Sequence, residues 1–182
     1  LSSPVQIPGT TWSNIYPGRY GTLAMKTDGT LWGWGDNGLG QLGDNSNVKR
    51  SSPVQVPGTT WKQVSACGSG AVMATKTDGT LWGWGLNNSG ELGLGTRVDN
   101  EAYSSPIQIP GTTWAEVVCN PSSANSMARK TDGTIWSWGY NSQGQLGQND
   151  KTTRSSPIQI GTDTDWSAVT ATYYSFLAYK NA

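Results

Sequence analysis

The chain has 182 residues, its twelve Lys and Arg balance its twelve Asp and Glu, and only 13% of its residues are charged. This balance, with no apolar run long enough to span a bilayer, predicts neither a nucleic-acid partner nor membrane insertion. Histidine is absent, which excludes Ser-His-Asp and Cys-His catalysis and every histidine-ligated metal site.

A ten-residue phrase occurs three times, as KTDGTLWGWG at 26–35 and 76–85 and as KTDGTIWSWG at 130–139. Ser-Ser-Pro segments begin at Ser2, Ser51, Ser104 and Ser155, with spacings of 49, 53 and 51 residues. We therefore divide a single repeat domain, residues 1–182, into units of approximately 2–50, 51–103, 104–154 and 155–182, of which the last is incomplete. Tandem units of this length are typical of repeat architectures.

Each unit predicts four short strands. In the first unit, PVQIP (4–8) is flanked by prolines, which cannot donate ladder hydrogen bonds, so we place it at a sheet edge. The segment TTWSNI (10–15) alternates with the two-residue period of a strand. LAMK (23–26) and LWGWG (31–35) are joined by Thr-Asp-Gly, a hairpin signal in which glycine takes a positive φ. The turn glycines of the three copies are Gly29, Gly79 and Gly133.

Four antiparallel strands in about 50 residues, repeated in tandem, predict an all-β chain that forms a β-propeller of four-stranded antiparallel blades. Three blades are complete in this sequence, and a fourth is incomplete. The alternative is a parallel β-helix, which usually has shorter coils and lacks such a regular hairpin signal.

The repeated phrases contain pairs of tryptophans two positions apart, which therefore share one face of a strand. A small residue between them (Gly33, Gly83 or Ser137) lies on the opposite face of the strand. Large side chains on one face and small ones on the other allow one blade to pack closely on the next. The alternative is an exposed aromatic platform for sugars or a protein partner. The pairs are Trp32 and Trp34, Trp82 and Trp84, and Trp136 and Trp138.

No catalytic, cofactor or metal site is predicted. The loop acids are scattered rather than paired, no calcium-loop spacing occurs, and the glycine-rich loops lack the Lys-Ser/Thr of a phosphate-binding loop. Cys67 and Cys119 fall at nearly matching places in neighbouring units, and matching positions usually lie farther apart than disulfide geometry allows. We expect them to be small buried free thiols, with a disulfide as the alternative.

The loops that differ between units are the candidate binding surface, because the shared positions already account for the blade. Their Tyr, Arg, Lys and Asn side chains are of types found on adaptable recognition surfaces. The candidate residues are Tyr16, Arg19, Tyr20, Asn47, Lys49, Arg50, Arg97, Asp99, Tyr103, Asn120, Lys151 and Arg154.

The segments LWGWGDNGLGQLG, LWGWGLNNSGELG and IWSWGYNSQGQLG resemble the repeat of the regulator-of-chromosome-condensation family, whose signature is a Trp-Gly-x-Asn-x-x-Gly-Gln-Leu-Gly run. The resemblance covers nearly the whole chain and implies a propeller, most often of seven blades. Near-identical repeats, the absence of histidine and the Trp/Asn/Gly/Thr-rich composition resemble bacterial and bacteriophage members more than eukaryotic nuclear ones.

From these features we expect a non-enzymatic binding or structural module without cofactor, such as a phage virion or tail component or a cell-surface protein. Its partners are expected to be proteins, further copies of the chain, or a surface glycan, in an extracellular or virion-surface location. The alternatives are a secreted inhibitor of a partner enzyme, a regulator similar to guanine-nucleotide exchange factors, and a lyase or glycosidase built on the loops.

The incomplete fourth unit leaves sheet edges that must be covered. Three ways of closing the ring stay open: the chain belongs to a longer propeller, its N-terminal strand pairs with its C-terminal strands, or two chains join with an even blade count.

Overall fold

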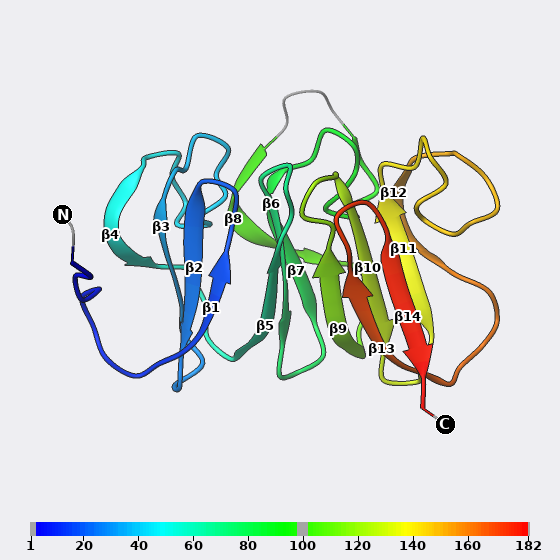
Figure 1. The fold of residues 1–182 in the computed structure, drawn as a ribbon, viewed down its shortest axis with the longest axis horizontal. Helices are drawn as coiled ribbons and strands as arrows, with labels where there is room; N and C mark the ends of the chain where they lie inside the picture. Colours follow the sequence, from blue (N-terminus) through cyan, green and yellow to red (C-terminus); the bar gives the residue numbers. More distant parts are fainter. Residues whose placement is uncertain (1–2, 98–101, 182) are drawn as a thin grey trace.

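The computed structural model describes residues 3–97 and 102–181, and within them every regular element is a strand (Figure 1). The first sheet contains β1 (Trp12–Pro17), β2 (Gly21–Lys26), β3 (Leu31–Gly35) and β4 (Arg50–Gln55), and the second contains β5 (Trp61–Ala66), β6 (Ala71–Lys76), β7 (Leu81–Leu86) and β8 (Ala102–Ile109). The third contains β9 (Trp114–Cys119), β10 (Asn125–Lys130), β11 (Ile135–Gly139) and β12 (Arg154–Gln159), and β13 (Trp166–Ala171) pairs with β14 (Phe176–Lys180). The predicted all-β class and the four-stranded antiparallel blades are confirmed.

The sheets are offset from the sequence units by one strand. The Ser-Ser-Pro segment that opens a unit pairs with the Trp-Gly-Trp strand of the unit before it, so β4 lies against β3 and β12 lies against β11. The corresponding segment at 3–11 forms no strand and pairs with no described sheet. Each complete sheet therefore combines three strands of one unit with one strand of the next.

The core lies between neighbouring sheets, which stand side by side in Figure 1 with β5 against β9 and β9 against β13. Trp84 and Trp138 are fully buried there, and each indole N–H donates to a backbone carbonyl of the preceding sheet, Gln41 at 3.0 Å and Glu91 at 2.8 Å. Trp34, which has no preceding sheet within the described residues, is only partly buried. These inner tryptophans thus pack one blade on the next.

The outer tryptophans of the pairs, Trp32, Trp82 and Trp136, are half-buried instead of fully enclosed. The ammonium group of Lys76 lies 4.3 Å from the ring centroid of Trp82 and 4.6 Å from that of Trp61. In the first sheet Lys26 lies in the same way over the rings of Trp12 and Trp32. In the third sheet Lys130 lies over those of Trp114 and Trp136. The chain's own lysines therefore lie over the half-buried tryptophan rings.

The expectation of free thiols is wrong, because Cys67 and Cys119 form a disulfide. Their Cα atoms lie 4.9 Å apart, within the range that a disulfide needs. Cys67 directly follows β5 and Cys119 ends β9, and these two strands are neighbours in the structure. Matching positions on adjacent blades come close here because the first strands of the second and third sheets, β5 and β9, lie next to each other.

The Asn/Gly-rich loops are organised by a buried asparagine that follows each Trp-Gly-Trp strand. The Oδ1 atom of Asn141 accepts the backbone N–H of Leu146 at 2.9 Å, and its Nδ2 donates to the carbonyls of Asp150 and Thr152, both at 3.1 Å. Asn37 and Asn87 make the equivalent bond to Leu42 and Leu92. One side chain thereby fixes a loop of more than ten residues, which positions the surface described next.

Candidate functional site

Antiparallel pairing sends two kinds of connection to opposite faces of the molecule. The loops at 18–20, 36–49, 67–70, 87–97, 120–124, 140–153 and 172–175 follow the first and third strands of the sheets and reach the face at the top of Figure 1. We call this the loop face. The Thr-Asp-Gly hairpins and the Pro-Gly-Thr-Thr connections reach the opposite face, which we call the turn face. The described parts of the loops that differ between units therefore lie on one face.

The candidate residues differ in how accessible they are. Asn120 is fully buried and accepts hydrogen bonds from Ser122, so its side chain is not accessible to a partner. Tyr16 and Tyr103 are partly buried against the core, and burial raises the pKa of Tyr16, whose hydroxyl also bonds the backbone of Val64. Asp99 lies outside the described residues. The exposed candidates are Arg19, Tyr20, Asn47, Lys49, Arg97 and Lys151.

Several loop-face carboxylates already have a cationic partner on the same face. Arg50 Nη2 lies 2.7 Å from Asp44 Oδ2, and Arg154 makes the same kind of ion pair with Asp150. Lys49 pairs with Asp36 at 2.9 Å. The hydrogen bond from Lys49, with one from Gln41, lowers the pKa of Asp36, so this carboxylate is ionised at neutral pH.

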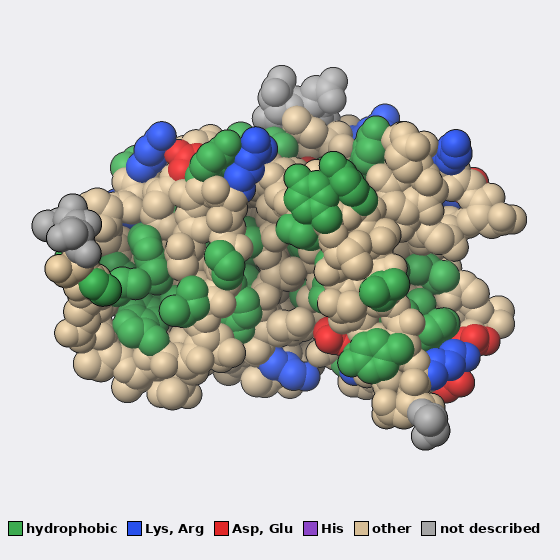
Figure 2. Space-filling view, in the orientation of Figure 1, with side chains coloured by type: hydrophobic (Ala, Val, Ile, Leu, Met, Phe, Trp, Pro, Cys, Tyr) green, Lys and Arg blue, Asp and Glu red, His purple; other side chains and the backbone are tan. Residues whose placement is uncertain are grey.

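Three exposed cations of this face, Arg19, Arg97 and Lys151, have no carboxylate partner among the residues described. The guanidinium of Arg19 lies over the ring of Tyr20, 5.0 Å from its centroid. Figure 2 shows Lys and Arg side chains along this edge of the molecule, interspersed with hydrophobic ones. Among the residues described, cations therefore outnumber carboxylates on the loop face, although the whole chain has zero net charge.

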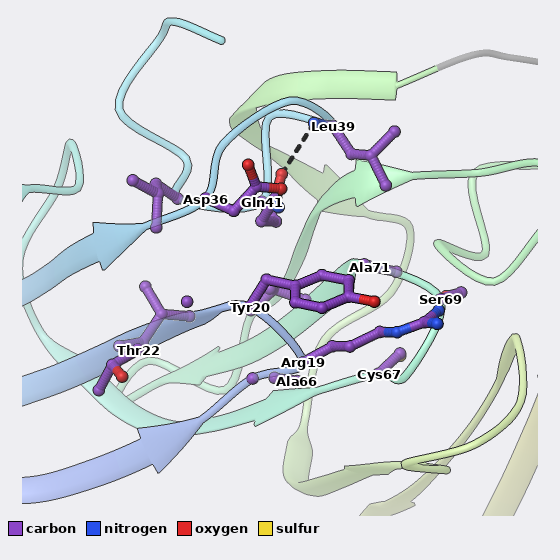
Figure 3. A pocket seen from close by; sticks show the side chains of 16 residues that line it. Arg19, Tyr20, Thr22, Asp36, Leu39, Gln41, Ala66, Cys67, Ser69 and Ala71 are labelled. Carbon is purple, nitrogen blue, oxygen red and sulfur yellow. Dashed lines mark hydrogen bonds between the residues drawn. The ribbon is translucent and has the colours of Figure 1, made fainter. Parts of the chain in front are cut away.

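A pocket of about 130 Å³ opens on the loop face between the first and second sheets. Figure 3 shows Arg19 and Tyr20 on one side of it and Asp36, Leu39 and Gln41 on the other. The loop that carries Leu39 is held in place because its backbone N–H donates to Gln41 Oε1 at 2.8 Å. The pocket brings two of the candidate residues, Arg19 and Tyr20, together with residues of the second sheet.

Sequence reasoning did not select Leu39 or Gln41, although one signal was present. Leu39 stands where the second and third units carry Ser89 and Gln143, so an exposed apolar residue replaces a polar one. Gln41 belongs to the repeated Gly-Gln-Leu-Gly phrase, which gives no sign that it differs in role from Gln145 of the third unit. The pocket needs loops from two different units, and such a pairing is not visible in the sequence.

The described residues contain no group of three or more Cys, Asp or Glu that could hold a metal ion. They also include no helix with the length and apolar character that a membrane crossing requires. The loop face presents exposed cations and tyrosines around a small cavity.

The chain is also similar to known proteins. The family model of the regulator of chromosome condensation (RCC1) repeat matches residues 28–75, 78–119 and 132–178, and a second model of this repeat matches 61–91 and 116–145. The chain belongs to the RCC1 repeat family. The predicted family resemblance is thereby confirmed at the level of the repeat.

The curated relatives include protein RCC2 of Mus musculus, 33% identical over 132 residues, and the RCC2 homolog of Danio rerio, 32% identical over 131 residues. Each alignment covers 70% of this chain and 25% or 26% of the relative, so the chain spans about a quarter of their length. None of the relatives named here is a bacterial or bacteriophage protein, so that part of the prediction gains no support.

Solved structures of the same fold include human WBSCR16, with a TM-score of 0.78 and 20% identity over 93% of this chain and 45% of that one. Prp20p of Saccharomyces cerevisiae, described with its binding properties to Gsp1p and histones, has a TM-score of 0.76 and 17% identity over 92% of this chain and 43% of that one. These matches concern the fold.

The prediction of an extracellular or virion-surface location is wrong. The curated relatives named above are RCC2 proteins of vertebrates, which do not fit a virion or extracellular protein. The prediction rested on composition and on the absence of histidine, which describe the packing of the blades and carry no information about the compartment.

Proposed function

We propose that this chain is a non-enzymatic, protein-binding propeller module that contacts its partner through the loop face. The observation that carries the proposal is the separation of the two faces. The described parts of the variable loops lie together, whereas the repeated turns lie on the other side. Variable loops held by a regular scaffold are where binding residues are usually found.

The charge of the loop face supports a partner with an acidic surface. Asp36, Asp44 and Asp150 are each neutralised by a neighbouring Lys or Arg, while Arg19, Arg97 and Lys151 remain exposed. Complementary charge accelerates association and orients the partner. Within the family's fold, Prp20p is described as binding Gsp1p and histones, which are proteins, and this chain's own partner is taken to be of the same broad class.

The open edges of the molecule form a second contact region, which we propose is covered by further blades of the same or another chain. Leu177 and Tyr179 on β14 are 56% and 55% exposed, and Ile15 on β1 is 63% exposed. Support also comes from the solved propellers, of which this chain covers only 43–45%. Sedimentation analysis shows whether a second copy of the chain covers these edges, since a second copy doubles the mass in solution.

The test of the loop face uses a library of random peptides, displayed on phage and selected on the purified chain. Affinities of the enriched peptides are then measured for the wild type, for the double variant Arg19→Ser/Lys151→Ser and for Lys62→Ser. Lys62 is an exposed lysine at the turn-face end of β5 and therefore provides a control for the loss of charge.

We expect the double variant to weaken binding roughly fivefold to tenfold, because each exposed ionic contact contributes up to about 1 kcal/mol, and Lys62→Ser to leave it within about twofold. Equal loss of affinity in both variants, or no enriched peptide at all, contradicts the assignment of the loop face.

A further inference from the structure

The pocket between the first two sheets has an apolar interior and a polar mouth. Its inner wall includes Leu23, Leu42 and Val72, which are 3%, 1% and 3% exposed. Leu39, which is 37% exposed, closes one side of the mouth, and Tyr20 closes the other (Figure 3). A group that enters this space exchanges water for apolar contact on most of its surface.

The corresponding crevice between the second and third sheets is closed by bonds that cross it. Ser126, at the position of Val72, donates to the carbonyl of Glu91 at 3.0 Å, and the N–H of Gly68 donates to the carbonyl of Asn120 at 3.2 Å. The disulfide between Cys67 and Cys119 adds a covalent link to this crevice. Within the described part of the chain, no hydrogen bond ties the loop at 18–20 to the second sheet, and the first crevice is open at this place.

The volume of the pocket limits what can occupy it. About 130 Å³ is less than the 300–1,000 Å³ of typical small-molecule sites. It is close to the roughly 150 Å³ of an engineered apolar cavity that holds one benzene molecule. A single leucine or phenylalanine side chain fits this volume, whereas a cofactor does not.

The charges at the mouth indicate what should flank that side chain. Asp36 is already bound by Lys49 and by Gln41, whose Nε2 donates to Asp36 Oδ2 at 3.0 Å. Arg19 stacks on Tyr20 at the mouth and has no carboxylate partner in the described part of the chain. A carboxylate next to the inserted side chain would complete the hydrogen bonding of its guanidinium.

We propose that this pocket receives one leucine-sized or phenylalanine-sized side chain from an acidic segment of the partner protein, and that Arg19 pairs with a neighbouring carboxylate. This inference rests on the proposed function, because it names the chemistry of the segment that the loop face binds. Deeply inserted apolar anchors in such pockets commonly supply most of the affinity of an interface.

The test compares two synthetic peptides, Gly-Ser-Asp-Glu-Phe-Asp-Glu-Ser-Gly and the same peptide with Ala in place of Phe. Binding to the isotopically labelled chain is followed by NMR through the methyl signals of Leu39, Leu42 and Val72. We expect the Phe peptide to shift these signals and to bind at least tenfold more tightly than the Ala peptide, as burial of a phenyl ring predicts.

Three variants locate the effect. Leu39→Ser introduces the residue of the second unit and should reduce the preference for Phe roughly fivefold or more, whereas Gln143→Ser, at the same position of the third unit, should leave it unchanged. Arg19→Ser should weaken both peptides equally and reduce the salt dependence of binding. Unchanged thermal unfolding of each variant shows that the fold is kept.

Equal binding of the two peptides to the wild type, or a Phe preference that survives in Leu39→Ser, would overturn the inference. Toluene that shifts the same methyl signals, without any effect of Arg19→Ser on the peptides, would show an apolar cavity with no role for an acidic segment, which also overturns it. The peptide-library selection decides the proposed function independently, since it does not depend on an apolar anchor.

Discussion

Asp28 Oδ1 accepts two hydrogen bonds from Thr30, one from its backbone N–H at 2.9 Å and one from its hydroxyl at 2.7 Å. The threonine hydroxyl in turn accepts the indole N–H of Trp32 at 2.9 Å. The same chain of bonds occurs in the second and third sheets. The hairpin turn and the outer tryptophan are therefore joined by one polar contact, which explains why Asp-Gly-Thr and Trp recur together.

This contact predicts a loss of stability in acid. The hydrogen bonds from Thr80 lower the pKa of Asp78, so the carboxylate stabilises the fold above its unfolded-state pKa of about 3.9, and this contribution is lost as the pH falls through the lower folded-state pKa. Asp78→Ala should reduce the Tm at pH 7 and differ less from the wild type at about pH 2. Asp78→Asn, which keeps the acceptor oxygen, is the control, and a Tm gap that is independent of pH would count against the explanation.

Glu91 predicts the opposite dependence on pH. It is fully buried, and burial raises its pKa although its Oε2 accepts the N–H of Ser89 at 2.7 Å. A raised folded-state pKa gives stability that is fully present below the unfolded-state pKa and is lost as the pH rises through the folded-state value. Glu91→Gln, the residue type of the first and third units, should therefore raise the Tm at pH 7.

An increase of about 2–4 °C corresponds to roughly 1 kcal/mol in a chain of this size. Thermal unfolding of both proteins from about pH 4 to 8 checks this prediction, and the Tm difference should widen as the pH rises. A constant difference would show that side-chain shape, and not ionisation, separates the two proteins.

Asn141 should be among the most sensitive single positions of the third blade. Asn141→Ala leaves the buried N–H of Leu146 and two carbonyls of the 140–153 loop without their partner. The expected cost is about 2–4 kcal/mol in the free energy of unfolding, measured by urea denaturation. Gln143→Ala, an exposed change in the same loop, should cost less than about 0.5 kcal/mol.

The disulfide predicts that reduction destabilises the chain. Cys67 and Cys119 are separated by 52 residues, and closing a loop of that length contributes about 4 kcal/mol in the chain-entropy description. Thiol titration of the unfolded, unreduced chain should detect no free thiol. Dithiothreitol should lower the Tm of the wild type but not that of Cys67→Ala/Cys119→Ala, and a wild type that is insensitive to it would contradict the pairing.

The turns of each unit and the packing of the repeated tryptophans between blades could be predicted from the sequence, whereas contacts between particular non-repeated residues of two units could not. Gly29, Gly79 and Gly133 have φ values of 78°, 79° and 80°, as the Thr-Asp-Gly hairpins predict. The disulfide could not be predicted, because strand spacing along the chain does not report how closely β5 and β9 converge. The pocket could not be predicted either, because its walls come from two sheets whose distance from each other the sequence does not report.

Accessibility was the other limit of sequence reasoning. Asn120 lies in a variable loop and looks available, yet its side chain is buried within the turn that it organises. Arg50 and Arg154 form ion pairs with carboxylates of the loops that precede them. The alternation of charged and polar residues in the sequence does not reveal these ion pairs. Variation between units selected residues that share the loop face, but only the structure separates the exposed residues from those that hold the loops.

The one-strand offset between the sequence units and the sheets has a consequence for how such a chain can grow or shrink. A recombination event that inserts or deletes one whole unit at a Ser-Ser-Pro boundary does not add or remove a self-contained blade. The new unit gives its first strand to the sheet before it and takes the fourth strand of its own sheet from the unit that follows, as β4 and β12 do. Every copy is thus joined to its neighbours by shared strands from the moment it is duplicated, so the array remains continuous without any new contact having to evolve.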